Sequence, residues 1–142
     1  MAKPVVVEGV QFEIYEGGVL NANGSVTVSS LCTPCSKVTI DGKKAYAGTL
    51  LVEVSKFTSS LLSNWVALSG STTTPAGVVS PGSIVSSATK ASTLEGKFFL
   101  EGDQATAVTI YGQISTPSGT SSATTVVTIK IKDAGQNVVN AT

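Results

Sequence analysis

Histidine and arginine are both absent from this 142-residue chain, and only 13% of its residues are charged. Histidine is the side chain that most often moves protons in catalysis. Arginine supplies the two-pronged clamp for phosphates and carboxylates, and the basic faces that bind nucleic acids are rich in it. The nine basic residues are all lysines, and nine acidic residues balance them. We therefore expect no nucleic-acid partner, no small-molecule substrate and no catalytic residue.

Long hydrophobic runs are also lacking. No apolar run approaches the roughly 18 residues of a membrane-spanning helix. The valines at 5–7 form too short a run for the hydrophobic region of a signal peptide, and Glu8 follows them at once. We expect a protein made in the cytoplasm without a signal peptide. A surface of low charge, rich in serine and threonine, fits a protein packed into an assembly, or a secreted one.

The residues that are abundant favour β-structure. The chain has 19 valines, 18 threonines and 19 serines, and β-branched side chains pack well on strands. We predict a mainly β fold, a single compact domain over 1–142 built of antiparallel hairpins in a cone-like or sandwich-like arrangement. Asn23-Gly24 is a strong hairpin signal. The predicted strands are 5–16, 25–30, 37–41, 49–55, 84–88, 97–101, 105–114 and 123–132, with a turn over 116–122 and a short strand in the tail 133–142.

One segment has a helical pattern. In residues 56–67, Phe57, Leu61 and Trp65 recur at intervals of four, so one short helix is predicted there. These three side chains are our candidates for a partner interface. A connector rich in glycine, proline, serine and threonine follows at 69–83.

The chain contains an internal repeat. Ile40-Asp41-Gly42-Lys43 aligns with Leu94-Glu95-Gly96-Lys97, and in both blocks four further residues lead to a closing glycine, Gly48 and Gly102. The pattern is typical of a hairpin in which the acidic residue and the glycine turn the chain. We infer a duplication that relates 28–55 to 85–113 across the connector.

Two cysteines lie in an insertion that the second copy of the repeat lacks. Cys32 and Cys35 have the C-x-x-C spacing of thiol redox proteins, but those motifs begin a helix, and a strand pattern follows here. A closed zinc site needs four ligands, and two sulfurs without imidazole supply too few unless carboxylates or a second subunit contribute. We interpret the pair as thiols of a loop, reduced or locally bridged, and expect no metal and no cofactor. The redox and zinc alternatives stay open.

The acidic residues could, by number, supply a hydrolase that uses two carboxylates. Asp41 and Glu95 match across the repeat as turn residues, however, and Glu13 and Glu53 fall on the polar phase of strands. We expect solvated faces for the acidic residues as a group: Glu8, Glu13, Glu16, Asp41, Glu53, Glu95, Glu101, Asp103 and Asp133.

The repeated block resembles the PAAR-like proteins, small tip proteins of contractile phage tails and related injection machines. The resemblance rests on the runs at 36–55 and 82–113, which include Glu101-Gly102-Asp103, and on "DAGQNVVNA" near the end. It implies a compact β cone that caps a trimeric β-helical spike and helps it to penetrate a target membrane. The zinc apex of that family uses histidines, and this chain has none, so that site is not carried over.

Three hypotheses follow for the function. The first is a non-enzymatic structural protein at the tip of a contractile apparatus or virion, with the spike protein as its partner and the membrane as a transient one. The second is a capsid decoration protein or other virion surface protein, which explains the same composition. The third is an enzyme, such as a cell-wall hydrolase with paired acids.

Overall fold

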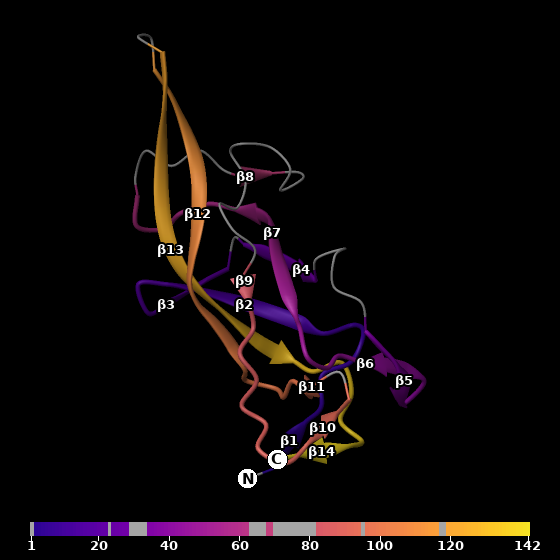
Figure 1. The fold of residues 1–142 in the computed structure, drawn as a ribbon. Coiled ribbons are helices and arrows are strands. Elements are labelled where there is room, and N and C mark those ends of the chain that lie inside the picture. The colour runs from indigo at the N-terminus through magenta and orange to yellow at the C-terminus, as the bar shows by residue number, and fades with distance from the viewer. Residues whose placement is uncertain are drawn as a thin grey trace.

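Strands make up 59% of the chain in a computed structural model, and the residues that it describes contain no helix. The structure describes residues 2–22, 24–28, 34–62, 68–69, 82–94, 96–116 and 119–142. The strands pair antiparallel throughout, in two four-stranded sheets and three small two-stranded ones. The prediction of a mainly β protein is therefore confirmed (Figure 1).

The first sheet is built around a long hairpin. Its strand order is β12-β13-β2-β3, with bounds Gln104–Thr116, Gly119–Asp133, Gln11–Glu16 and Val19–Asn21. Strand β12 pairs with β13 from Gln104 to Thr116, with one bulge, but β2 pairs only with the part of β13 from Val127 to Asp133. The rest of the hairpin leaves the body as a two-stranded ribbon, and both chain termini lie at the opposite end (Figure 1).

The second sheet lies against the first. Its order is β4-β7-β8, with β9 also on β7, and its bounds are Ser25–Val28, Leu51–Phe57, Leu68–Ser69 and Gly82–Ser83. Inward-facing residues of both sheets form one cluster, which includes Ile14, Ile110 and Ile129 from the first and Val54 and Phe57 from the second. Each such side chain contributes about 1.5–3 kcal/mol on burial. The arrangement is sandwich-like.

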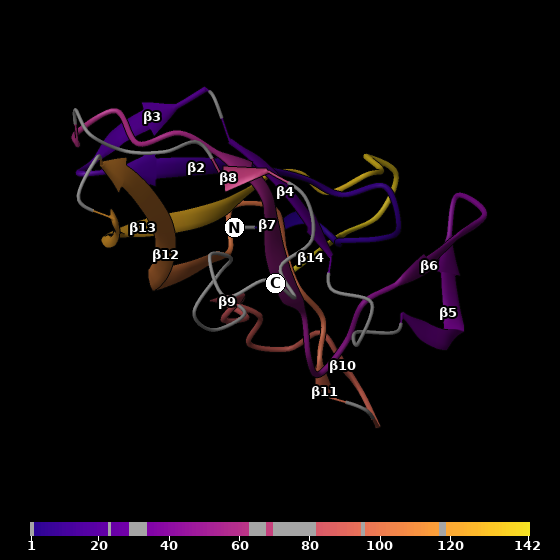
Figure 2. The same ribbon diagram turned by 90° about the horizontal axis from the view of Figure 1, so that it is seen from above.

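Three small sheets complete the end of the molecule away from the ribbon. They are β5 with β6, β10 with β11, and β1 with β14, with bounds Cys35–Ile40, Lys43–Ala45, Ser92–Thr93, Gly96–Lys97, Lys3–Pro4 and Asn140–Ala141. Seen from above, the β5–β6 hairpin stands away from the body (Figure 2). The buried valines at 5–7 run between the two repeat blocks, since the Val6 amide donates to the Phe99 carbonyl oxygen and its own carbonyl accepts from Tyr46.

The two repeat blocks both form hairpins, but their turns differ. In the first, Ile40 pairs with Lys43 around Asp41 and Gly42, whose φ angles of 54° and 77° fit a two-residue type I′ turn. This confirms the first predicted turn. In the second, Thr93 pairs with Gly96, so the turn begins at Leu94, one position earlier than the alignment predicted. The duplication itself stays a prediction.

The helix predicted for 56–67 is wrong in its described part. Strand β7 continues to Phe57, and residues 58–62 are not helical, while 63–67 lie outside the described residues. Val52, Val54 and Phe57 are fully buried, and their packing in the sandwich core outweighs the helical spacing. The predicted strand at 84–88 is also wrong, because only a single bridge forms there, between Val85 and Gln104.

Asn23 of the hairpin predicted at Asn23-Gly24 lies outside the described residues, and the flanking strands β3 and β4 do not pair with each other. Strand β3 turns back on β2 at Gly17 and Gly18, whose φ angles are 61° and 81°, and β4 joins the other sheet. The Gly-Gly pair supplies the two positive φ angles that a tight hairpin needs. The segment at 22–24 therefore connects the sheets. The long strand predicted at 5–16 is likewise broken, by a turn at Glu8 and Gly9.

Candidate functional site

The β12–β13 ribbon is the most distinctive surface feature of the described structure. We define the ribbon as 109–116 of β12 with 119–126 of β13, the part of the hairpin beyond the last pair with β2. A bulge between Ala105 and Val108 bends β12 just before it. Among the described residues, no strand pairs with either outer edge of the ribbon.

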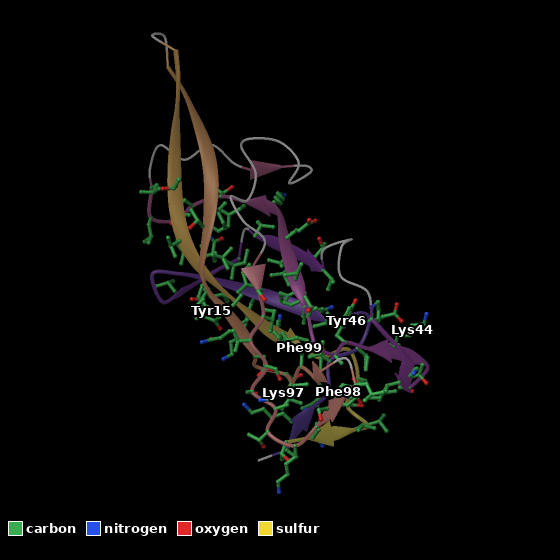
Figure 3. The ribbon with its side chains drawn as sticks, in the orientation of Figure 1. Tyr15, Lys44, Tyr46, Lys97, Phe98 and Phe99 are labelled. Atoms are coloured by element: carbon green, nitrogen blue, oxygen red, sulfur yellow. The ribbon has the colours of Figure 1, made fainter. Side chains whose placement is uncertain are left out.

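The outer face of the first sheet continues the surface at the root of the ribbon. Tyr15 lies between Thr128 and Leu20 across the strands, and Val126 and Leu20 are 55% and 51% exposed. Tyr15 is labelled in Figure 3. Its hydroxyl donates to Glu13 Oε1 at 3.0 Å, and this hydrogen bond raises the pKa of Tyr15. This face offers apolar and hydroxyl groups to a partner.

A buried carboxylate fixes the root of the ribbon to the body. Glu16, the last residue of β2, is completely buried, which corrects its expected place on a solvated face. Its Oε2 accepts from the hydroxyls of Ser59, at 2.6 Å, and Thr125, at 2.9 Å. Its Oε1 accepts from the Ser60 amide at 2.8 Å, the Ser60 hydroxyl at 3.0 Å and Asn21 Nδ2 at 3.3 Å. The carboxylate thereby joins the first sheet to the segment at 59–60 that follows β7.

The pKa of Glu16 reflects two opposing effects. Burial acts to raise the pKa, because it removes water from the charged form. The hydrogen bonds from Ser59, Ser60 and Thr125 act to lower it, and together they prevail, so that the pKa lies below its ordinary value. Glu16 is thus a charged structural anchor whose two oxygens are both occupied by protein donors.

A second buried carboxylate stabilises the turn that carries the family resemblance. Asp103 is 5% exposed, which again corrects the expectation of a solvated acid. It accepts from the amide of Leu100, at 2.9 Å, and from the amide and hydroxyl of Ser87. Gly102 has a φ of 92°, which glycine adopts without strain. Asp103 therefore caps the turn between Leu100 and β12.

An open groove of about 540 Å³ lies beside Asp103. Lys3 and Lys130 line it, together with Ser86 and Ser87. The Asp103 oxygens accept hydrogen bonds from Ser87 and Leu100, which hold the carboxylate in place beside the groove. The groove offers two cations, Lys3 and Lys130, beside hydroxyl groups.

Two of the three predicted partner residues lie within the described structure, and their environments differ. Phe57 is fully buried in the core, Leu61 is 60% exposed and lies against Gly17, and Trp65 is outside the described residues. Cys32 also lies outside them, and for Cys35 the structure places only the backbone, in β5. Within the part of the chain that is described, no three acidic or cysteine side chains form a possible metal site.

The comparisons with known proteins add no identification. No family model matches the chain, and searches among curated proteins and solved structures found no match either. No helix of the described ranges is long and apolar enough to cross a membrane.

Proposed function

We infer that the protein is a non-enzymatic structural component of a phage particle or contractile injection machine. The observation that carries this proposal is the ribbon, which projects from the body and has two edges without a partner strand among the described residues. An isolated two-stranded ribbon is marginally stable in water, and long open edges invite uncontrolled association. A surface of this kind is suited to a joint between subunits.

Within this class, the resemblance to PAAR-like proteins suggests the tip of a contractile spike. The protein would cap a trimeric β-helical spike and meet the target membrane only transiently. Asp103 supports this proposal in a limited way, because it fixes the turn at 101–103 on which the resemblance partly rests.

The ribbon favours the second candidate, a capsid decoration protein or other virion surface protein. A decoration protein occurs in many copies and needs lateral contacts, whereas a tip protein caps its assembly once. A projecting ribbon provides a lateral contact directly.

Imaging of the particle that carries the protein, combined with a count of copies per particle, tests the proposal. One copy at an apex supports the spike tip, and many copies on a shell or tube support the surface protein. Absence of the protein from purified particles, with all of it free in the lysate, would overturn the structural role. A pull-down at micromolar concentration with the trimeric spike tests the first candidate on its own.

A further inference from the structure

The hydrogen-bonding groups that point away from the ribbon can be assigned from its register. Thr116 pairs with Gly119 and closes the hairpin across two residues, so this pair exchanges backbone hydrogen bonds. Such pairs alternate along an antiparallel ladder. The amides of Ile110, Gly112 and Ile114 therefore face β13. Their odd-numbered neighbours face the open edge of β12: Thr109, Tyr111, Gln113 and Ser115.

The same rule assigns the edge of β13. Thr124 and Val126 pair with Tyr111 and Thr109, so their amides point away from β12. The same alternation continues into the sheet, where Thr128 pairs with Tyr15. The β2–β3 hairpin agrees with it, because its closing pair, Glu16 and Val19, turns the Glu16 amide toward β3 and the Tyr15 amide toward β13. Each edge of the ribbon therefore presents a regular row of donors and acceptors.

The sequence of the ribbon does nothing to block these rows. No charged residue stands between Gln104 and Lys130. Natural edge strands are commonly protected by lysine, by an inward charge, by proline or by a bulge. The bulge here precedes the ribbon, and the one proline, Pro117, stands between its two strands. Among the described strands nothing pairs with these edges, and their sequence leaves them open to strand addition.

The lengths of the available edges indicate the partner. Each ribbon edge offers eight residues, 109–116 and 119–126. Other outer edges among the described strands of the two large sheets are shorter, three residues in β3 and four in β4. Another ribbon matches the full length, and two uncharged edges meet without like-charge repulsion.

We propose that the ribbon pairs edge to edge with the ribbon of a second copy of this chain. Backbone hydrogen bonds supply the contact, as in other cases of strand addition. Pairing of β12 with β12 gives a two-fold dimer, and pairing of β12 with a neighbour's β13 gives a ring where the rotation closes and an open filament where it does not. The inference rests on the proposed structural role but can fail separately, since a monomer that binds another particle protein would keep that role.

Amide hydrogen exchange at several protein concentrations tests the pairing directly. In the assembled protein, the amides of Thr109, Tyr111 and Gln113 should exchange about tenfold or more slowly than after dilution to monomer. The amides of Ile110 and Gly112 should be protected at every concentration. A ring should also protect Thr124, whereas a β12-to-β12 dimer should not. The proposal is overturned if the odd and even amides of β12 respond alike.

A proline variant isolates the outward amides. The double substitution Gln113→Pro/Ser115→Pro removes two outward donors and leaves those toward β13 in place. Light scattering should show association weakened about a hundredfold or more, since both copies lose donors. The matched control Gln113→Thr/Ser115→Thr keeps the amides and should associate as the wild type does. Equal association of the proline and threonine variants would refute edge pairing.

A charge variant keeps the test valid if proline unfolds the ribbon. Gln113→Lys places the same charge on every copy, so association should weaken at low salt and recover as salt screens the repulsion. Thr27→Lys, on the exposed face of β4, is the matched control and should have no effect. The wild-type protein could instead stay monomeric alone and show protected outward amides only after the spike trimer is added. In that case the partner of the ribbon is the spike and not a second copy.

Discussion

Glu16 should stabilise the fold through its charge as well as its hydrogen bonds, and Glu16→Gln separates the two. Glutamine has the same shape, and its carbonyl oxygen can still accept from the amide and hydroxyl of Ser60. Its amide nitrogen then replaces Oε2, so the hydroxyls of Ser59 and Thr125 must accept a hydrogen bond where they now donate one. The site stays filled but loses its negative charge.

The expected loss follows from these contacts. Hydrogen bonds to a charged group contribute about 1.5–3 kcal/mol each, and neutral ones about 0.5–1.5 kcal/mol. If the two hydroxyl bonds each weaken by about 1 kcal/mol, Glu16→Gln should lower the free energy of unfolding by about 2 kcal/mol at neutral pH. Glu16→Ala should cost about 3–5 kcal/mol, because it leaves the buried Ser59 hydroxyl without this acceptor and opens a cavity.

The pH dependence provides the decisive test. Because the pKa of Glu16 is lowered in the folded state, its charge stabilises the protein above its ordinary pKa of 4.5, and this stabilisation is lost as the pH falls through the folded value. The difference between the wild type and Glu16→Gln should therefore shrink as the pH falls from neutral to below 4.5. Urea denaturation followed by far-ultraviolet circular dichroism measures both variants.

A control on the same strand guards against a general effect of removing an acid. Glu13→Gln, on the outer face of β2, keeps an oxygen for the Tyr15 hydroxyl and should change stability by less than about 0.5 kcal/mol. A difference between the wild type and Glu16→Gln that is equally large at neutral and acid pH would refute the role of the charge.

Two further predictions concern turns. Gly42→Ala should cost about 1 kcal/mol, because φ is +77° but an added Cβ meets nothing within 4 Å, whereas Gly96→Ala should cost about 2–4 kcal/mol, because its Cβ would lie 2.7 Å from the Gly48 Cα. Equal losses in thermal denaturation would contradict this close packing. Asp103→Ala should cost about 3 kcal/mol and Asp103→Asn about 1 kcal/mol, since only asparagine still offers an oxygen to the Leu100 amide. The same denaturation assay compares the two, and similar losses would argue against the cap.

The alternation of apolar and polar residues predicted most strands, because a half-buried strand has only two faces. The predicted strands overlap with five of the longer observed ones, which are β4, β5, β7, β12 and β13. The pattern does not say which strands become neighbours. Strand β3 pairs with β2 because Gly17 and Gly18 adopt the positive φ angles of a tight hairpin. The chain that follows β3, where the Asn23-Gly24 signal lies, leads to the second sheet instead.

The strand pattern already indicated that Glu16 is buried, although the sequence analysis placed it on a solvated face. Phe12 and Ile14 face inward, and the same period of two places Glu16 on the buried side of β2. An acid in that phase must find donors, and serines at 59–60 and Thr125 supply them from segments far away in the sequence. The acid could be placed from the strand pattern, but its partners could not, because they come together only through the tertiary fold.

The ribbon marks a different limit. Strands were predicted at 105–114 and 123–132, with the turn at 116–122, yet the ladder continues to the pair of Thr116 with Gly119. The serines and threonines at the ends of these strands led to the prediction of a loop, because such residues are common in loops. They extend the hairpin to a point where no described strand of the same chain lies alongside. The root of this uncharged ladder is fixed to the body through Ile110 and Thr125, but its outer edges expose backbone groups. The proposed pairing with a second copy would account for the length of the ladder beyond that root.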